Sequence, residues 1–432
     1  MSATDTDSLP AKFRWLPSPL RPPGGMTRRE ERIFLLVGMA ALFAGFDQNV
    51  YGFAISQIQV SLHIPENEIG LTVTFFRFAA IAAMGLSLCA DIVGRRRLLL
   101  FTIFGQAAFT LATAFAQTYP QFVWLQVFTR VFGYSEEMLC AVVVVEEVAA
   151  NVRGWAAGTL ASLDYLGAGF ASLFFAFVNI LPGHWRAMYV IGGLSLFFVA
   201  FLRRRLPETK RFEIRSEEVQ KLGARIGGAL DMVRRLMREY PGRLLLIFII
   251  VGAWGFAIGP ATVLGNKYMQ QTLGFAPWQT TALVIPGGLF ALYLNILTGR
   301  ASDRFGRKLV VFIMMALCGF AFAGFYSGLK GWAIAPIWVA AFYSFFTADS
   351  LMGGFALEIV PTAYRATVGG LRYTVEIMMG GLALGLEGLW YDHFHAHDPA
   401  ISVALLAIPI SLVGVLFLPE PAGRVLEDIS HA

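Results

Sequence analysis

The sequence contains few charged residues and few cysteines. Asp, Glu, Lys and Arg make up 15% of its 432 residues, whereas soluble domains carry roughly 25%. The three cysteines, Cys89, Cys140 and Cys318, all lie within apolar segments, where we expect them to pack as small hydrophobic side chains. Their spacing is not that of metal ligands, so the sequence predicts no disulfide, no metal site and no cofactor.

Signatures of several other protein classes are also absent from the sequence. There is no phosphate-binding loop of the Gly-x-x-x-x-Gly-Lys-Ser/Thr type, so the sequence does not indicate ATP-driven work by this chain, and no enzyme signature is present. The polar, proline-rich N-terminal tail contains no apolar stretch that ends at a small-residue cleavage site. We therefore expect the first apolar segment itself to direct the chain to a membrane.

Long apolar runs dominate the rest of the chain. Hydrophobic residues make up 56% of it, and the mean hydropathy is +0.62. Twelve runs approach the ~20 residues that an α-helix needs to cross a bilayer. They predict an all-α membrane protein with twelve transmembrane helices, at residues 33–53, 69–90, 97–117, 121–146, 155–181, 187–202, 243–263, 279–299, 308–328, 332–357, 366–389 and 400–418.

Lys and Arg accumulate on one side of this predicted topology. The loops of the opposite side hold only Arg186, Lys267 and Lys330. Because basic residues mark cytoplasmic loops, both termini are predicted to be cytoplasmic, in a plasma membrane or bacterial inner membrane. The formal charge of +5 then reflects topology, and no nucleic-acid partner is expected. The predicted parts are a tail (1–32), a six-helix half (33–203), a central loop (204–242), a second six-helix half (243–418) and a tail (419–432).

The chain repeats itself at an offset of 212 residues. The recurring segments are Asp91-Ile92-Val93-Gly94-Arg95-Arg96 with Asp303-Arg304-Phe305-Gly306-Arg307-Lys308, Glu146…Arg153 with Glu358…Arg365, and Pro207-Glu208 with Pro419-Glu420. At the same offset, Glu137 corresponds to Asp349 and Asp164 to Glu376. Parallel repeats of membrane-spanning helices build transporters whose site lies at the repeat interface.

These motifs resemble those of the major facilitator superfamily, and the likeness covers essentially the whole chain. The family's loop pattern, Gly-x-x-x-Asp-Arg/Lys-x-Gly-x-Arg/Lys-Arg/Lys, is strong at 299–308 and less complete at 87–97. The resemblance implies two pseudo-symmetric six-helix bundles that function as a monomer in the lipid bilayer. It also implies a cytoplasmic gate, although the same residues could merely fix loop geometry. The implied gate residues are Asp91, Gly94, Arg95, Arg96, Glu146, Arg153, Asp303, Gly306, Arg307, Lys308, Glu358 and Arg365.

Ten charged side chains fall inside the predicted spans, where each costs roughly 2.5–3.5 kcal/mol on insertion scales. At a rise of ~1.5 Å per residue, Asp47 has two candidate arginine partners near its depth, Arg77 and Arg130. Asp47 and Arg130 resemble the Asp and Arg that couple protonation to transport in proton-driven sugar porters. The resemblance implies that protonation of Asp47 releases Arg130. The alternative is a buried ion pair that fixes helix register.

Seven residues are predicted to line a substrate cavity. Carboxyl groups near the midplane suit the binding of hydroxyl, ammonium or proton, and Trp and Tyr each offer a hydrogen-bond donor together with a ring face. The predicted cavity residues are Arg77, Glu137, Asp164, Tyr165, Trp254, Asp349 and Glu376. The alternative is that the carboxyl groups satisfy neighbouring hydroxyls and that the aromatic residues only pack.

The sequence therefore predicts secondary transport of a small organic solute by alternating access, coupled to protons. Gly45-Phe46-Asp47 followed by Tyr51-Gly52 resembles the organic-acid and aromatic-acid symporters of the superfamily, which favours an organic acid over a sugar-like metabolite. Two alternatives remain. The excess of acidic residues in the spans favours a proton-driven exporter of organic cations, and a solute receptor would signal through the central loop, which at about forty residues is short for a signalling module.

Overall fold

The computed structural model describes residues 22, 26–88, 94–148, 152–204, 234, 237–360 and 365–420. Within these ranges the chain forms helices and no β-strand. Its contacts divide it into two compact units, Met1–Ile58 with Ala79–Leu222, and Gln59–Phe78 with Gly223–Ala432. The chain therefore passes between the units twice before the predicted central loop, because residues 59–78 belong with the second unit.

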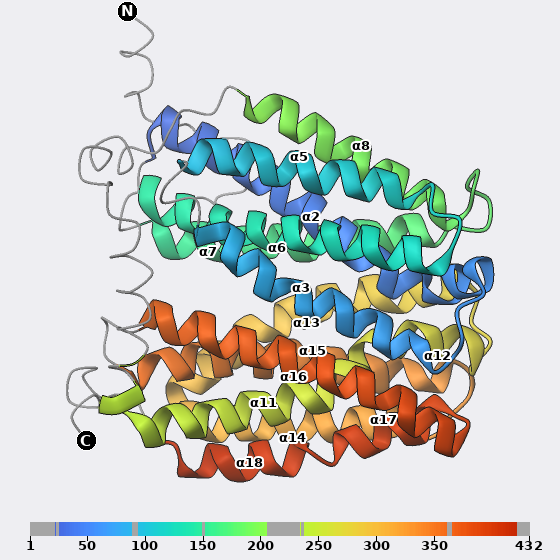
Figure 1. Ribbon diagram of the computed structural model, residues 1–432. Helices are drawn as coiled ribbons and strands as arrows, with labels where there is room; N and C mark the ends of the chain where they lie inside the picture. The colour runs from blue at the N-terminus through green and yellow to red at the C-terminus, as the bar shows by residue number, and fades with distance from the viewer. Residues whose placement is uncertain are drawn as a thin grey trace, which may run out of the picture. The chain divides into compact units, whose positions relative to one another are not determined.

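Within the described residues, the first unit contains six helices, in whole or in part. They are α2 (Arg28–Leu62) as far as Ile58, the later part of α3 (Glu68–Leu88), α5 (Arg95–Thr113), α6 (Tyr119–Glu147), α7 (Arg153–Phe175) and α8 (Trp185–Arg203). α5 packs against both α6 and α8 (Figure 1). Apolar side chains such as Val37, Leu99 and Val143 form a buried cluster between α2, α5 and α6.

The second unit contains the early part of α3 and the helices of the second repeat. These helices are α11 (Pro241–Val263), α12 (Gly265–Gln271), α13 (Pro277–Phe305), α14 (Arg307–Phe325), the 3-10 turn η2 (Gly331–Ala333), α15 (Ile334–Glu358), α16 (Arg365–Phe394), α17 (His397–Leu405) and α18 (Ile408–Phe417). α11 runs beside α16, and α14 beside α15 (Figure 1).

The predicted all-α membrane fold is confirmed. Each of the first eleven predicted spans coincides with one long helix, and the twelfth is formed by α17 followed by α18. Among the described residues, eight helical segments are both long and apolar enough to cross a membrane. α6 and α16 are not among these eight, and each carries three charged residues in its interior: Arg130, Glu136 and Glu137 on α6, and Arg372, Glu376 and Glu387 on α16.

Two glycines make the same turn in the two repeats. Gly94 precedes α5 with φ 101° and ψ 144°, and Gly306 precedes α14 with φ 102° and ψ 140°. Side chains with a Cβ rarely adopt a positive φ of this kind, whereas glycine adopts it readily. The repeated motif therefore places an arginine at the first position of each following helix, Arg95 on α5 and Arg307 on α14.

A close approach between helices also occurs once in each repeat. A Cβ added to Gly45 would lie 2.1 Å from the carbonyl oxygen of Asp164, and one added to Gly255 would lie 2.3 Å from that of Glu376. α2 therefore contacts α7 in the first unit as α11 contacts α16 in the second. Asp164 and Glu376 are 212 residues apart, like the other repeated motifs, but Gly45 and Gly255 are 210 residues apart. The helices α2 and α11 therefore align at an offset of 210 residues.

Candidate functional site

Asp47 is held inside the first unit by two side chains of α5. Its carboxylate is buried, with Oδ1 accepting a hydrogen bond from the Thr110 hydroxyl at 3.0 Å and Oδ2 accepting one from the Gln106 amide at 3.3 Å. Gln106 and Thr110 lie four residues apart, so they share one face of α5. Neither residue is among the predicted site residues, although two polar residues at this spacing within an apolar segment indicate a buried polar partner.

Arg130 of α6 lies beside the same carboxylate. The residue is 5% exposed, and its guanidinium donates to the carbonyl oxygen of Gln48, the neighbour of Asp47, at 2.9 Å. Its charge attracts the Asp47 carboxylate. The structure thus brings together the two residues that the sequence pairs.

A second buried cluster in this unit surrounds Arg203. This side chain is fully buried; it forms an ion pair with Glu136 and donates to the Leu36 carbonyl at 3.1 Å and to the Cys140 sulfur at 3.3 Å. Thr102 donates to the same Glu136 carboxylate at 2.5 Å. Charge pattern alone groups Arg203 with the basic residues that follow it, but the last turn of α8 directs its side chain into the protein.

Glu137 and Asp164 form an acidic pair in the first unit. They are close enough to repel each other, and neither forms an ion pair among the residues that the structure describes. Glu137 is solvent-accessible although it lies deep in the protein, as a residue that lines a cavity would be. Tyr165, adjacent to Asp164, is 43% exposed. The three predicted cavity residues of this unit therefore lie on α6 and α7.

In the second unit the corresponding acids are bridged by an arginine. Nη1 of Arg372 contacts Oδ1 of Asp349 at 3.4 Å and Oε2 of Glu376 at 3.1 Å. Arg77 attracts Glu376, and its side chain lies against Gly381 and so closely over Gly380 that a Cβ added to Gly380 would lie 2.0 Å from Arg77 Nη1. Arg372 is not among the cavity residues that the sequence predicts, but the structure places it at the centre of this cluster.

Trp254 presents an unused donor in the same unit. Its side chain is 1% exposed and stacks on Phe345, with ring centroids 6.4 Å apart and planes at 17°. No acceptor for its indole N–H exists among the described residues. A buried indole N–H normally has a partner. Trp254 also directly precedes Gly255, which contacts Glu376, so this N–H is a candidate donor to a bound solute.

The predicted cytoplasmic motifs form a well-defined corner in the second unit. Arg307 and Glu358 pair through two contacts, Nε to Oε2 at 3.2 Å and Nη2 to Oε1 at 3.1 Å. Glu420 accepts the backbone N–H groups of Arg307 at 2.9 Å and Lys308 at 3.0 Å. This remote carboxylate therefore caps the first turn of α14, where negative charge is favourable. Lys308 also donates to the carbonyl of Leu416.

The first copy of this motif is described in part. Arg95 is buried, and Arg96 donates to the carbonyl of Arg204 at 2.8 Å. The remaining predicted gate residues lie outside the described part of the chain, wholly or by their side chains. They are Asp91, and the side chains of Glu146, Arg153, Asp303 and Arg365.

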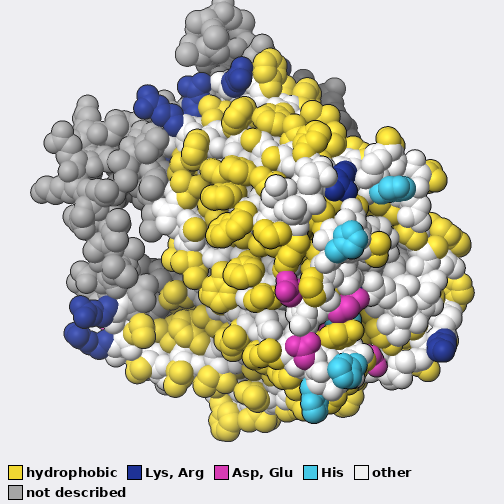
Figure 2. Space-filling view, turned by 45° about the vertical axis from the view of Figure 1, so that its right-hand side comes forward, with side chains coloured by type: hydrophobic (Ala, Val, Ile, Leu, Met, Phe, Trp, Pro, Cys, Tyr) yellow, Lys and Arg dark blue, Asp and Glu magenta, His cyan; other side chains and the backbone are white. Residues whose placement is uncertain are grey.

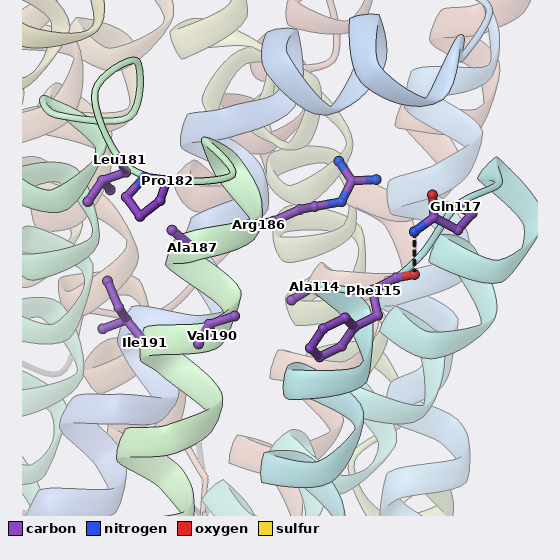
Figure 3. Close-up of a pocket in the computed structure, with 9 residues that line it drawn as sticks. All are labelled: Ala114, Phe115, Gln117, Leu181, Pro182, Arg186, Ala187, Val190 and Ile191. Carbon is purple, nitrogen blue, oxygen red and sulfur yellow. Dashed lines mark hydrogen bonds between the residues drawn. The ribbon is translucent and has the colours of Figure 1, made fainter.

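A separate hollow of about 440 Å³ lies in the first unit, at the end of α5 and the start of α8 (Figure 3). Apolar side chains such as Phe115, Leu181 and Val190 line most of it, and Gln117 donates to the Phe115 carbonyl at 3.2 Å. Arg186 extends toward the Ala116 carbonyl and donates to it at 2.7 Å. None of the predicted cavity residues lines this hollow, so it is not the site that the sequence predicts.

Comparisons with known proteins agree on one family. The model of the Major Facilitator Superfamily matches residues 37–384. The chain is 23% identical to the "Probable 4-methylmuconolactone transporter" of Cupriavidus pinatubonensis over 90% of each chain. It is 24% identical to the niacin transporter of Acinetobacter baylyi, over 91% of this chain and 95% of that one. Among solved structures, the D-xylose–proton symporter superposes with a TM-score of 0.70 at 18% identity, covering 91% of this chain and 99% of that one.

Proposed function

This chain belongs to the major facilitator superfamily, and from that premise we propose that it is a proton-coupled symporter of small organic acids. Membership makes it a multi-pass membrane transporter of small solutes and not an enzyme. The finer assignment, of proton coupling and of an acid as substrate, rests on the two charged clusters. The direction of the chain, with both termini in the cytoplasm of a plasma or bacterial inner membrane, and the functional monomer remain predictions from the sequence.

The observation that carries proton coupling is the environment of Asp47. A buried carboxylate with neutral donors from Gln106 and Thr110, and with Arg130 beside it, has two low-energy states. Ionised Asp47 attracts Arg130, while protonated Asp47 keeps hydroxyl and amide partners and frees the arginine. Since ionisation without a partner is costly at this depth, gain of a proton and movement of Arg130 are linked, which supports alternating access driven by protons.

The second cluster supports an anionic substrate. Arg372 and Arg77 supply positive charge near Glu376, and Trp254 adds a ring and an unused N–H donor. A planar carboxylate accepts paired hydrogen bonds from a guanidinium, and an attached ring can pack against an indole. Niacin, the substrate in the name of one relative, has this combination of a ring and a carboxylate.

A vesicle experiment tests this proposal. Purified protein is reconstituted with a pH indicator inside, and niacin, 4-methylmuconolactone, D-xylose or tetraphenylphosphonium is added outside. Symport of an acid acidifies the interior beyond what protein-free vesicles show. The Asp47→Asn variant should lose this acidification while still binding the acid, whereas Asp392→Asn, which removes an exposed carboxylate of α16, should retain it. Equal acidification by wild type and Asp47→Asn would refute coupling through Asp47.

Export of organic cations is the second candidate, and the acidic pair of the first unit favours it. Glu137 and Asp164 have no cationic partner among the described residues, so they could receive one from a solute. In the same vesicles, exchange of protons for tetraphenylphosphonium would make the interior more alkaline. That result, with no response to the acids, would replace symport by antiport as the function.

A further inference from the structure

Four charged or titratable residues meet in the second unit, outside the clusters already described. Glu66 lies between α2 and α3, Lys267 on α12, Glu387 on α16, and His397 is the first residue of α17. They come from four separate segments, yet all belong to one compact unit. In the predicted topology, this end of the helices faces away from the cytoplasm. Figure 2 shows Asp and Glu side chains close to one another, with His side chains nearby, at the edge of a broad apolar surface.

The imidazole of His397 joins two carboxylates. Its Nδ1–H donates to Oε1 of Glu387 at 2.6 Å, and its Nε2 lies 3.0 Å from Oε2 of Glu66. The same Nε2 lies 2.9 Å from Nζ of Lys267, which also forms an ion pair with Glu66. The ring of Tyr391 packs against the imidazole, with centroids 4.5 Å apart and planes tilted by 34°.

Nε2 cannot serve both of these neighbours in one protonation state. In the neutral ring, Nδ1 carries the proton for Glu387, so Nε2 accepts from Lys267 and cannot donate to Glu66. In the charged ring, Nε2–H donates to Glu66, and the imidazolium bridges both carboxylates. Glu387 is fully buried, and its Oε2 has no partner among the described residues. A buried carboxylate of this kind is better compensated by a cation than by a neutral donor.

The groups around the imidazole favour the charged form in sum. Two carboxylates contact it against one ammonium group, so a neutral His397 leaves the cluster with an excess of negative charge. The other titratable groups at this end of the packed elements are His63 after α2, Glu68 of α3, Tyr268 of α12, Tyr391, Asp392 and His393 of α16, His395 before α17, and Asp398 of α17. The acidic groups among these, Glu68, Asp392 and Asp398, favour the imidazolium over the neutral ring.

Glu66 stays ionised throughout the range in which a histidine titrates. Burial raises the pKa of Glu66, but hydrogen bonds from His397, Lys267 and Gln59 lower it by more, to about 2. The switching group at neutral pH is therefore the imidazole and not this carboxylate.

The segment that Glu66 anchors is itself tightly packed on α16. Thr74 donates to the Gly381 carbonyl at 2.7 Å, and a Cβ added to Gly388 would lie 2.1 Å from the Asn67 carbonyl oxygen. A Cβ added to Gly70 would lie 1.9 Å from the carbonyl oxygen of Leu384. Residues 59–78 therefore lie against α16 with little free space, and the charged cluster closes one end of this contact.

We propose that His397 is a proton-binding site that locks residues 59–78 onto α12, α16 and α17. With the proton bound, the imidazolium ties Glu66 to Glu387; without it, this tie is lost and the segment separates more easily. Acidity on the side that this cluster faces then favours the locked arrangement. This site is distinct from Asp47 and does not depend on which solute the protein carries.

The test measures the distance across the lock as a function of pH. Nitroxide labels are placed at Val60→Cys and Ser402→Cys, two exposed positions on α2 and α17, in a Cys89→Ser background. The remaining cysteines, Cys140 and Cys318, are buried. In lipid nanodiscs, electron–electron resonance should show one short distance at about pH 5.5 and an added longer one at about pH 8.5, since histidine titrates between them.

Three variants make the result specific. His397→Gln should give the same distances at both pH values, whereas His393→Gln, which removes an exposed histidine of α16, should keep the wild-type response. Glu66→Gln should show the longer distance at both pH values. At about pH 5.5, the population with the longer distance should be about ten times that of wild type. A wild-type distance that ignores pH, or an unchanged response in a monodisperse His397→Gln protein, would overturn the proposal. Because no solute is added, failure of symport would leave this result intact.

Discussion

The two repeats share a backbone plan but differ in where they place charge. The first repeat carries Asp47 and Arg130 with the polar partners Gln106 and Thr110. At the corresponding positions the second repeat has Ala257, Phe342, Cys318 and Phe322. A buried carboxylate is costly unless its partners are present. The second repeat lacks the carboxylate and also lacks the residues that would partner it. Among the described residues, the buried Asp47 cluster therefore has no counterpart in the second repeat.

Both repeats contain a pair of acidic residues, but only the second repeat has an arginine between them. In the second repeat Arg372 bridges Asp349 and Glu376, while Leu160 occupies the corresponding position beside Glu137 and Asp164. The exchange of Arg372 for Leu160 thus separates a cluster that contains a cation from an acidic pair that forms no ion pair among the described residues. The two repeats therefore share the helix contacts at Gly45 and Gly255 but not the charges beside them.

The largest expected effect concerns Arg203 and Glu136, which the second repeat replaces by Val415 and Ala348. Arg203→Val alone leaves Glu136 buried without its partner and should destabilise the protein by ~3–5 kcal/mol. The double change Glu136→Ala with Arg203→Val copies the second repeat and should recover most of this loss. The unfolding temperatures of wild type, Arg203→Val and the double variant in detergent measure this loss and recovery of stability. A double variant no more stable than the single one would show that the pair does more than compensate charge.

Arg372→Leu makes the second repeat resemble the first. It removes the cation between Asp349 and Glu376, so binding of an organic acid should weaken about 10- to 100-fold, or ~1.5–3 kcal/mol. Calorimetric titration with the acid that gives the largest vesicle signal measures this change. Leu160→Arg is the matched change in the first repeat, and it should leave acid binding within a few-fold of wild type. Acid binding that survives Arg372→Leu unchanged would place the anion elsewhere.

Glu420→Gln tests the cap on α14. Loss of the negative charge at the two backbone N–H groups should cost ~1 kcal/mol locally. Hydrogen exchange at the amides of Arg307 and Lys308 should then speed up about fivefold. Glu358→Gln is the control, because it removes the side-chain partner of Arg307 and leaves the capping carboxylate in place. Equal acceleration in both variants would attribute the protection to the ion pair and not to the cap.

The smallest effect is the pH dependence contributed by Glu66. Its pKa is lowered from 4.5 to about 2, so its contribution to stability is complete above about pH 4.5 and is lost as the pH falls through about 2. The difference in unfolding temperature between wild type and Glu66→Gln should therefore shrink as the pH falls through this range. A difference that stays constant down to about pH 2 would mean that the hydrogen bonds do not favour the ionised form.

The helices and the repeat could be predicted from the sequence, because apolar length and basic loops follow from the bilayer alone. The pairing of Asp47 with Arg130 could also be anticipated, since their depths on two helices are matched. The partners of Arg203 could not, because the direction of a side chain at a helix end depends on tertiary packing. The same holds for His397, whose three partners come from segments far apart in the chain. The periodicity of a sequence does not predict such long-range contacts.

Residues 59–78 have a consequence for how the protein could be divided. If the chain were cut in the central loop and the two pieces, 1–222 and 223–432, were produced separately, the second piece would lack a segment that its own contacts require. The first piece would carry that segment without its binding partner. The two pieces should therefore reassemble when they are produced together, because residues 59–78 of the first piece bind the second piece. The second piece, produced without the first, should fold better when residues 59–78 are fused to it.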